Sequence, residues 1–190
     1  MSNERFRGAW RGIVCLALGA TLVSPPVIAA GNGTDAAQDV ALKAAFLYNF
    51  AKFAEWPALP AGARIIACIV GDDGLAAAVV DTVRGQNISG HAIEVWRPQN
   101  SGTWRGCHLL FIADAETRQS ADGLGGIKTL PVLTVSDGKG FSRAGGIIEL
   151  YVEGGRMRFA INVDAAERSG LRLSSRLLGL AKVVRNGDVQ

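Results

Sequence analysis

The side chains best suited to metal binding or nucleophilic chemistry are two histidines and three cysteines: His91, His108, Cys15, Cys68 and Cys107. A zinc site needs several such groups to converge on one point. Cys107 and His108 are adjacent in an apolar run typical of a strand, where neighbouring side chains point to opposite faces. The sequence has no H-E-x-x-H motif. We therefore expect no metal site.

Motifs for catalysis or cofactor binding are also missing. No serine lies in a G-x-S-x-G elbow, and the glycines at 123–126 lack the spacing of a phosphate-binding loop. The run 134–138 (TVSDG) places polar groups at the end of a predicted strand, where open α/β sheets often bind ligands. Strand-end capping and a turn also explain that run. We expect no catalytic residues and no cofactor, so the protein is not expected to be an enzyme.

The first 30 residues have the three parts of an export signal in the usual order. An arginine-rich start precedes an apolar run at 12–23, and two prolines then lead to Ala29 and Ala30, after which signal peptidase would cut. The apolar run is shorter than the roughly 20 residues that span a bilayer. We expect a cleaved signal peptide over 1–30 and a periplasmic mature protein. An uncleaved anchor is the alternative, and a lipoprotein at Cys15 fits less well because no small residue precedes that cysteine.

Charge and composition narrow the function classes further. Apolar residues make up 48% of the chain and charged residues 19%, as in a chain that buries a core. The formal net charge is +3, but 17 basic and 16 acidic residues remain once the signal's three arginines and Glu4 are removed. A nearly neutral mature protein argues against nucleic-acid binding.

Export also changes the cysteine count. Cleavage would remove Cys15 and leave Cys68 and Cys107, and an even count in an exported chain indicates a disulfide. Closing a loop of about 40 residues would contribute roughly 3–4 kcal/mol in the chain-entropy model. Two free buried thiols are the alternative.

The middle of the chain alternates short apolar runs with helical patterns. We expect strands over 64–70, 90–96, 107–113 and 132–136 and helices over 39–56, 75–84 and 115–125, with a loop over 97–106. In the first helix, apolar residues form two adjoining stripes that should dock on a sheet. Runs of this kind are typical of a parallel sheet covered on both faces.

The C-terminal part has a different pattern. The runs 146–152 and 156–163 flank Gly154-Gly155, which predicts an antiparallel hairpin at one edge of the sheet. A final helix is expected over 164–184. The predicted fold is α/β: a mostly parallel sheet flanked by helices, an α/β sandwich, with an antiparallel C-terminal hairpin at the edge. The predicted domains are the signal peptide 1–30, a polar lead-in 31–38 and a single domain 39–190.

The hairpin is also the candidate partner-binding surface. Apolar residues occupy both of its faces, and only one face can pack on the core. Ile148 and Leu150 would contact the partner, and Arg168 would rim the patch. The alternative is that helices, or a second copy of the chain, cover both faces of the hairpin. On the predicted last helix Arg168, Arg172 and Arg176 share one face, either as a solvated surface or as a recognition surface for an acidic partner.

The sequence resembles the YfiR family along most of the mature chain, about 39–184. The resemblance begins with the helix 42–57 (LKAAFLYNFAKFAEWP). It continues through Cys68 before Val70-Gly71, the Cys107-His108 strand, the run 133–141 (LTVSDGKGF) and the run 158–162 (RFAIN), and ends at 165–178 with GLRLSSRLL over 170–178.

This resemblance implies a periplasmic repressor. It would bind the periplasmic domain of a YfiN-type membrane diguanylate cyclase, hold cyclic di-GMP low and so limit biofilm formation. A YfiB-type outer-membrane lipoprotein would release the cyclase. The family fold is an α/β sandwich that tends to form homodimers. Cys68 and Cys107 match the family's structural disulfide, whereas a second cysteine pair near the hairpin is missing here.

A sensor of small molecules that acts on another membrane receptor, such as a histidine kinase, is the second hypothesis. Its candidate ligand contacts are Asp137, Phe141 and Arg172, with Arg168 near the same pocket.

Overall fold

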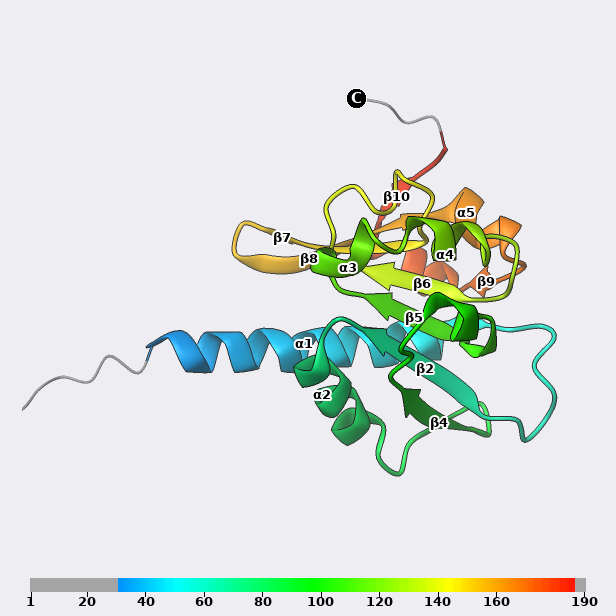
Figure 1. The fold of residues 1–190 in the computed structure, drawn as a ribbon, viewed down its shortest axis with the longest axis horizontal. Helices are drawn as coiled ribbons and strands as arrows, with labels where there is room; N and C mark the ends of the chain where they lie inside the picture. Colours follow the sequence, from blue (N-terminus) through cyan, green and yellow to red (C-terminus); the bar gives the residue numbers. More distant parts are fainter. Residues whose placement is uncertain (1–30, 187–190) are drawn as a thin grey trace, which may run out of the picture. The chain divides into compact units, whose positions relative to one another are not determined.

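The computed structural model describes residues 31–186, so the predicted signal peptide over 1–30 lies outside the described residues. The main sheet has eight strands: β2 (Ile65–Val70), β3 (Asn87–Ile88), β4 (His91–Trp96), β5 (Leu109–Ile112), β6 (Leu133–Ser136), β7 (Ile148–Glu153), β8 (Arg156–Asn162) and β10 (Lys182–Val184). Their order is β10-β8-β7-β6-β5-β2-β4-β3 (Figure 1). The β7–β8 and β3–β4 pairs are antiparallel and the others are parallel, which confirms the predicted fold class.

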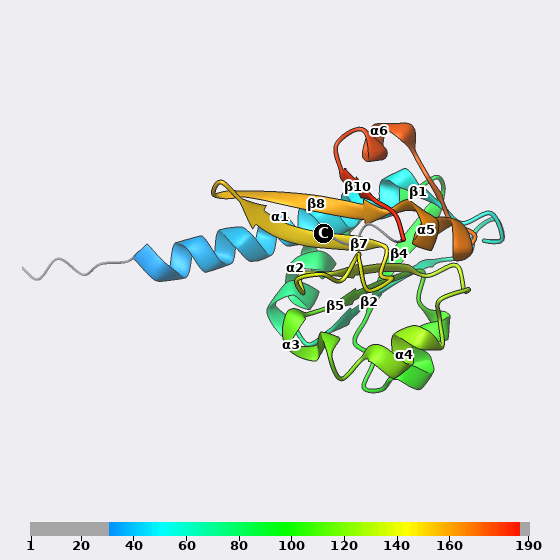
Figure 2. The ribbon, with the colours of Figure 1, turned by 90° about the horizontal axis from the view of Figure 1, so that it is seen from above.

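The central strands are buried on both faces, which explains their continuous apolar runs. Odd-numbered residues of β2 and β5, such as Ile69 and Phe111, belong to one core cluster together with two helices, α1 (Gly31–Phe53) and α2 (Asp73–Val83). Even-numbered residues, such as Leu110, belong to a second cluster. That cluster contains Trp104 of the 3₁₀ helix η1 (Ser101–Gly106), inside the predicted loop over 97–106. The sheet therefore has a helical layer on each face (Figure 2).

Helix α1 begins eight residues before the predicted start at Asp39 and ends three residues before Trp56. Its buried side includes Ala44, Leu47 and Phe50, each at most 1% exposed. Because these residues recur at steps of three, one face of the helix packs on the sheet, as the pattern predicted. No helix within residues 31–186 has the length and apolar character needed to cross a membrane.

A disulfide joins Cys68 in β2 to Cys107, which directly follows η1. Their Cα atoms are 5.8 Å apart, and both residues belong to the second core cluster. The bond therefore attaches the η1 segment covalently to a central strand, and it agrees with the even cysteine count expected after signal-peptide cleavage.

The prediction of one final helix over 164–184 is wrong. The segment instead forms α5 (Val163–Arg168), β9 (Arg172–Leu173), α6 (Ser175–Leu178) and the edge strand β10. Gly170 has a positive φ of 71°, which ends α5, and Ser174 caps α6 by accepting a hydrogen bond from the Leu177 N–H. Arg168, Arg172 and Arg176 therefore do not share a helix face.

Two smaller differences concern short elements. The predicted helix over 115–125 is divided into α3 (Asp114–Thr117) and α4 (Ala121–Gly125). A separate two-stranded sheet pairs β1 (Ala54–Glu55) with β9, so the chain after α1 contacts the C-terminal region. The β7–β8 hairpin lies where predicted, and β10 adds one parallel strand beyond it.

Replacing both Cys68 and Cys107 by alanine should lower the thermal midpoint of the mature protein under oxidising conditions. The bond closes a segment with a sequence separation of 39, so its loss should cost roughly 3–4 kcal/mol of unfolding free energy. Differential scanning calorimetry with and without a strong reductant measures this effect. Reduced wild-type protein should melt close to the double variant, and equal melting of oxidised wild-type and variant protein would contradict the stabilising role of the bond.

Candidate functional site

Two residues predicted to contact a partner, Ile148 and Leu150, are instead core residues. Their exposed fractions are 0% and 2%. β7 lies between β6 and β8 in the sheet, and both side chains belong to the core cluster that includes α1. The predicted alternation of side chains between the two hairpin faces was correct, but Ile148 and Leu150 lie on the face that α1 covers. They therefore cannot form a surface contact in this conformation.

Further along the same strand face, the hairpin extends beyond the covered region. Val152 lies two residues after Leu150 and is 67% exposed. It pairs in register with Met157 of β8, so both side chains lie on the face that α1 approaches. Gly154 and Gly155, both with positive φ, make the two-residue turn that closes the hairpin tip.

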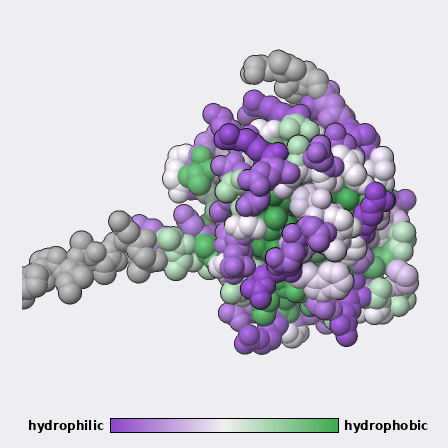
Figure 3. Space-filling model, in the orientation of Figure 1, coloured by the Kyte–Doolittle hydropathy of each residue, from purple (hydrophilic) through white to green (hydrophobic). Residues whose placement is uncertain are grey.

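The exposed end of the hairpin and helix α1 enclose an apolar groove of about 480 Å³. We call it the α1–hairpin groove; its lining residues are Asp39, Leu42, Phe46, Val152, Gly155, Arg156 and Met157. Leu42 of α1 is 43% exposed. Figure 3 shows hydrophobic surface at the hairpin tip and again on α1. With one acidic and one basic residue at its border, the groove has the apolar centre and polar rim of a protein-binding surface.

Aromatic contacts hold α1 against the hairpin next to this groove. The ring centroid of Phe159 in β8 lies 5.8 Å from that of Phe46 and 5.0 Å from that of Phe50, in edge-to-face arrangements. Such pairs contribute about 0.5–1.5 kcal/mol each beyond their buried area. The groove is therefore formed by two elements that are already fixed to each other.

An ion pair fixes the same helix to the sheet. Lys43 of α1 pairs with Asp137, which follows β6, and each side chain is 21% exposed. The other carboxylate oxygen of Asp137 accepts a hydrogen bond of 2.8 Å from the backbone N–H of Asp114 at the start of α3. Asp137 therefore connects α1 with two neighbouring strand ends, and this contact orients the helix that carries Leu42 and Phe46.

The candidate ligand contacts Asp137, Phe141 and Arg172 are not brought together. Phe141 is buried in a separate pocket, whose lining does not include Asp137. Arg172 is exposed in β9, in register with Glu55 of β1. Arg168 is exposed at the end of α5 and lines neither the α1–hairpin groove nor the Phe141 pocket. The structure therefore provides no common site for these residues.

The sequence reasoning placed the partner surface on the hairpin, which carries Val152, but it missed Leu42, Phe46 and Met157 as residues of the groove. One signal for them was present: α1 carries two adjoining apolar stripes, which is more than a single docking face requires. How much of the hairpin the helix covers depends on tertiary packing, and no local sequence pattern predicts it.

The histidines have structural partners. His108 Nδ1 accepts a hydrogen bond of 3.0 Å from the Ile66 backbone N–H, and the Trp56 indole donates to the His108 carbonyl oxygen at 3.1 Å. Burial lowers the pKa of His108, and the nearby His91 lowers it further. In the described part of the chain, no three His, Cys, Asp or Glu residues are clustered closely enough to hold a metal ion.

A comparison with protein families agrees with the resemblance seen in the sequence. A family model described as YfiR/HmsC-like matches residues 40–182. The match includes both cysteines of the disulfide, the whole hairpin and all of the α1–hairpin groove except Asp39.

Acidification should destabilise the folded protein through His108. The folded state resists protonation of this side chain because its pKa is lowered, whereas the unfolded chain takes up the proton near the ordinary histidine value of about 6.5. The stability that the neutral ring provides is therefore complete above about pH 6.5 and is lost as the pH falls through the lower folded-state pKa. Protonation would also remove the acceptor that Ile66 uses.

Chemical denaturation between about pH 7.5 and 5.5, a range that brackets the ordinary histidine pKa, measures this effect. His108→Asn keeps an acceptor near the Ile66 N–H but does not titrate, so its unfolding free energy should vary less with pH than that of the wild type. His91→Asn is the matched control and should keep most of the wild-type slope. If the unfolding free energies of the wild type and His108→Asn change equally with pH, His108 is not the cause of the loss of stability at low pH.

Proposed function

The chain belongs to the YfiR/HmsC-like family, which implies a periplasmic regulator of cyclic di-GMP signalling, and we propose that it represses a membrane diguanylate cyclase by direct binding. Its partner would be the periplasmic domain of a YfiN-type cyclase. While bound, the protein would hold the cyclase inactive and keep the cellular level of cyclic di-GMP low. Export through the signal peptide proposed for residues 1–30 would place it in the compartment of that domain.

The α1–hairpin groove is the observation that supports this proposal. It exposes apolar side chains from two elements that the Phe46–Phe159 and Phe50–Phe159 contacts hold rigidly together. A preformed surface loses little conformational entropy when a partner binds. Val152 and Leu42 would provide the apolar contact, while Asp39 and Arg156 at the border would favour one orientation of the partner through their charges.

Release of the cyclase would follow from competition for this surface. A YfiB-type outer-membrane lipoprotein that covers the groove would exclude the cyclase, because one apolar patch cannot be buried against two partners at once. Sequestration would then raise cyclic di-GMP and promote biofilm formation. This arrangement needs no reaction catalysed by the protein itself.

Replacing Val152 by glutamate should abolish repression without unfolding the protein. The side chain is 67% exposed, so a charge there costs little in the free protein, but it would be desolvated against an apolar partner surface. Co-purification with the cyclase's periplasmic domain should fall at least about tenfold, equivalent to about 1.4 kcal/mol. Cellular cyclic di-GMP should rise toward the level of a strain that lacks the protein.

Leu180→Glu is the matched control. Leu180 is an apolar residue that is 71% exposed and does not line the groove. This variant should keep both co-purification and repression. If Val152→Glu, at normal abundance and with an unchanged thermal midpoint, still represses the cyclase, the groove is not the binding surface. The Ile148→Glu variant should instead fail to fold, because residue 148 is fully buried.

A further inference from the structure

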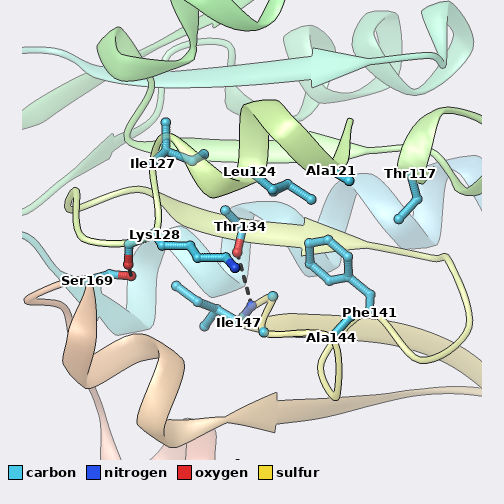
Figure 4. A pocket seen from close by; sticks show the side chains of 12 residues that line it. Thr117, Ala121, Leu124, Ile127, Lys128, Thr134, Phe141, Ala144, Ile147 and Ser169 are labelled. Atoms are coloured by element: carbon cyan, nitrogen blue, oxygen red, sulfur yellow. Dashed lines mark hydrogen bonds between the residues drawn. The ribbon is translucent and has the colours of Figure 1, made fainter. Parts of the chain in front are cut away.

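A second hollow lies on the other side of the sheet from α1, between α4, the β6–β7 connection and α5. We call it the Phe141 pocket; its volume is about 190 Å³ (Figure 4). Its lining includes six apolar side chains: Ala121, Leu124, Ile127, Phe141, Ala144 and Ile147. Its polar side chains are Thr117, Lys128, Thr134 and Ser169, and none of the lining residues is acidic.

The apolar wall is preformed. Phe141 is 3% exposed and Ile147 is 2% exposed. The Phe141 ring packs directly on the backbone of Gly146, where any Cβ would lie 2.1–2.5 Å from three of the ring atoms. Only glycine permits this contact, so residue 146 fixes the position of the ring. An apolar ligand would therefore meet a wall that is already ordered.

The opposite wall carries the ammonium group of Lys128, an exposed residue. Figure 4 shows the Lys128 side chain extended across the pocket toward Thr134. Within residues 31–186, no carboxylate forms an ion pair with Lys128. Thr134 Oγ1 accepts a hydrogen bond of 3.0 Å from the Ile147 N–H, and its own hydroxyl proton has no acceptor among the same residues. An ammonium and a hydroxyl donor thus face one apolar cavity.

We propose that the Phe141 pocket binds a small apolar carboxylate: a short acyl chain or a phenyl ring that bears one carboxylate group. The hydrocarbon body would pack against Phe141, Leu124 and Ile147. The carboxylate would accept hydrogen bonds from the Lys128 ammonium and the Thr134 hydroxyl. Hydrogen bonds to an ionised acceptor are stronger than those between neutral groups. An apolar cavity of about 150 Å³ accommodates benzene, so a volume of about 190 Å³ suits a body of roughly six to eight non-hydrogen atoms.

This site is independent of the α1–hairpin groove, because the two share no lining residue. Its ligand would be recognised by charge and size together. A neutral molecule of the same shape leaves Lys128 without a counter-charge, and a larger apolar acid exceeds the volume. The site therefore does not depend on whether the protein binds a cyclase.

The test is a titration of the isotopically labelled mature protein with hexanoate and with benzoate, followed by methyl and amide chemical shifts. For ligands of about nine atoms we expect saturable binding with a dissociation constant on the order of a millimolar. The largest shifts should fall on Leu124, Ile127 and Ile147. 1-Hexanol, the neutral analogue, should bind at least several-fold more weakly than hexanoate.

Two variants and one control localise the binding. Lys128→Met removes the charge but keeps the apolar stem and should weaken hexanoate binding about tenfold while leaving 1-hexanol unaffected. Ala121→Leu fills the pocket from an exposed position and should weaken both ligands; Ala115→Leu, at an exposed alanine of α3 outside the pocket, should weaken neither. Non-saturable shifts, or hexanoate binding that survives both Lys128→Met and Ala121→Leu, would overturn the proposal.

Discussion

The packing of helix α1 against the inner face of the β7–β8 hairpin is the constraint on which the rest of this surface depends. Phe159 of β8 contacts the rings of both Phe46 and Phe50, and Ile148 and Leu150 are buried in the same core cluster as that helix. Because the hairpin extends past the covered residues, the strand face that forms the core at Leu150 becomes a surface at Val152. The same contact thus stabilises the fold and leaves an apolar edge exposed.

Several interactions of different kinds maintain this geometry. The Lys43–Asp137 ion pair joins α1 to the ends of β5 and β6, while the disulfide fixes η1 to β2 on the other face. An ion pair that is only 21% exposed is costly to break, since one charge would remain partly desolvated. The groove and the Phe141 pocket are consequently built on elements that the core holds in place, which is the property expected of a protein that acts by binding.

Most of the sheet could be predicted from the sequence, because β2, β5 and β6 are buried on both faces and so appear as continuous apolar runs between turns. The prediction of one C-terminal helix was wrong because the leucines between 171 and 180 recur at nearly helical steps. The segment is instead divided by Gly170, by the cap at Ser174 and by the pairing of β10 with β8. The β10–β8 pairing joins residues about twenty positions apart, so no local pattern predicts it. The exposed groove could not be predicted either, since alternation identifies the two faces of a hairpin but not how far a helix covers one of them.

Hydrogen–deuterium exchange of the mature protein, alone and saturated with the periplasmic domain of the proposed YfiN-type cyclase, tests the central claim most directly. The account predicts slower exchange in the complex over residues 39–46 of α1 and 152–157 of the hairpin, with little change at α6 and β10. Protection confined to the β10 edge or to α4, with 39–46 and 152–157 exchanging as in the free protein, would contradict it.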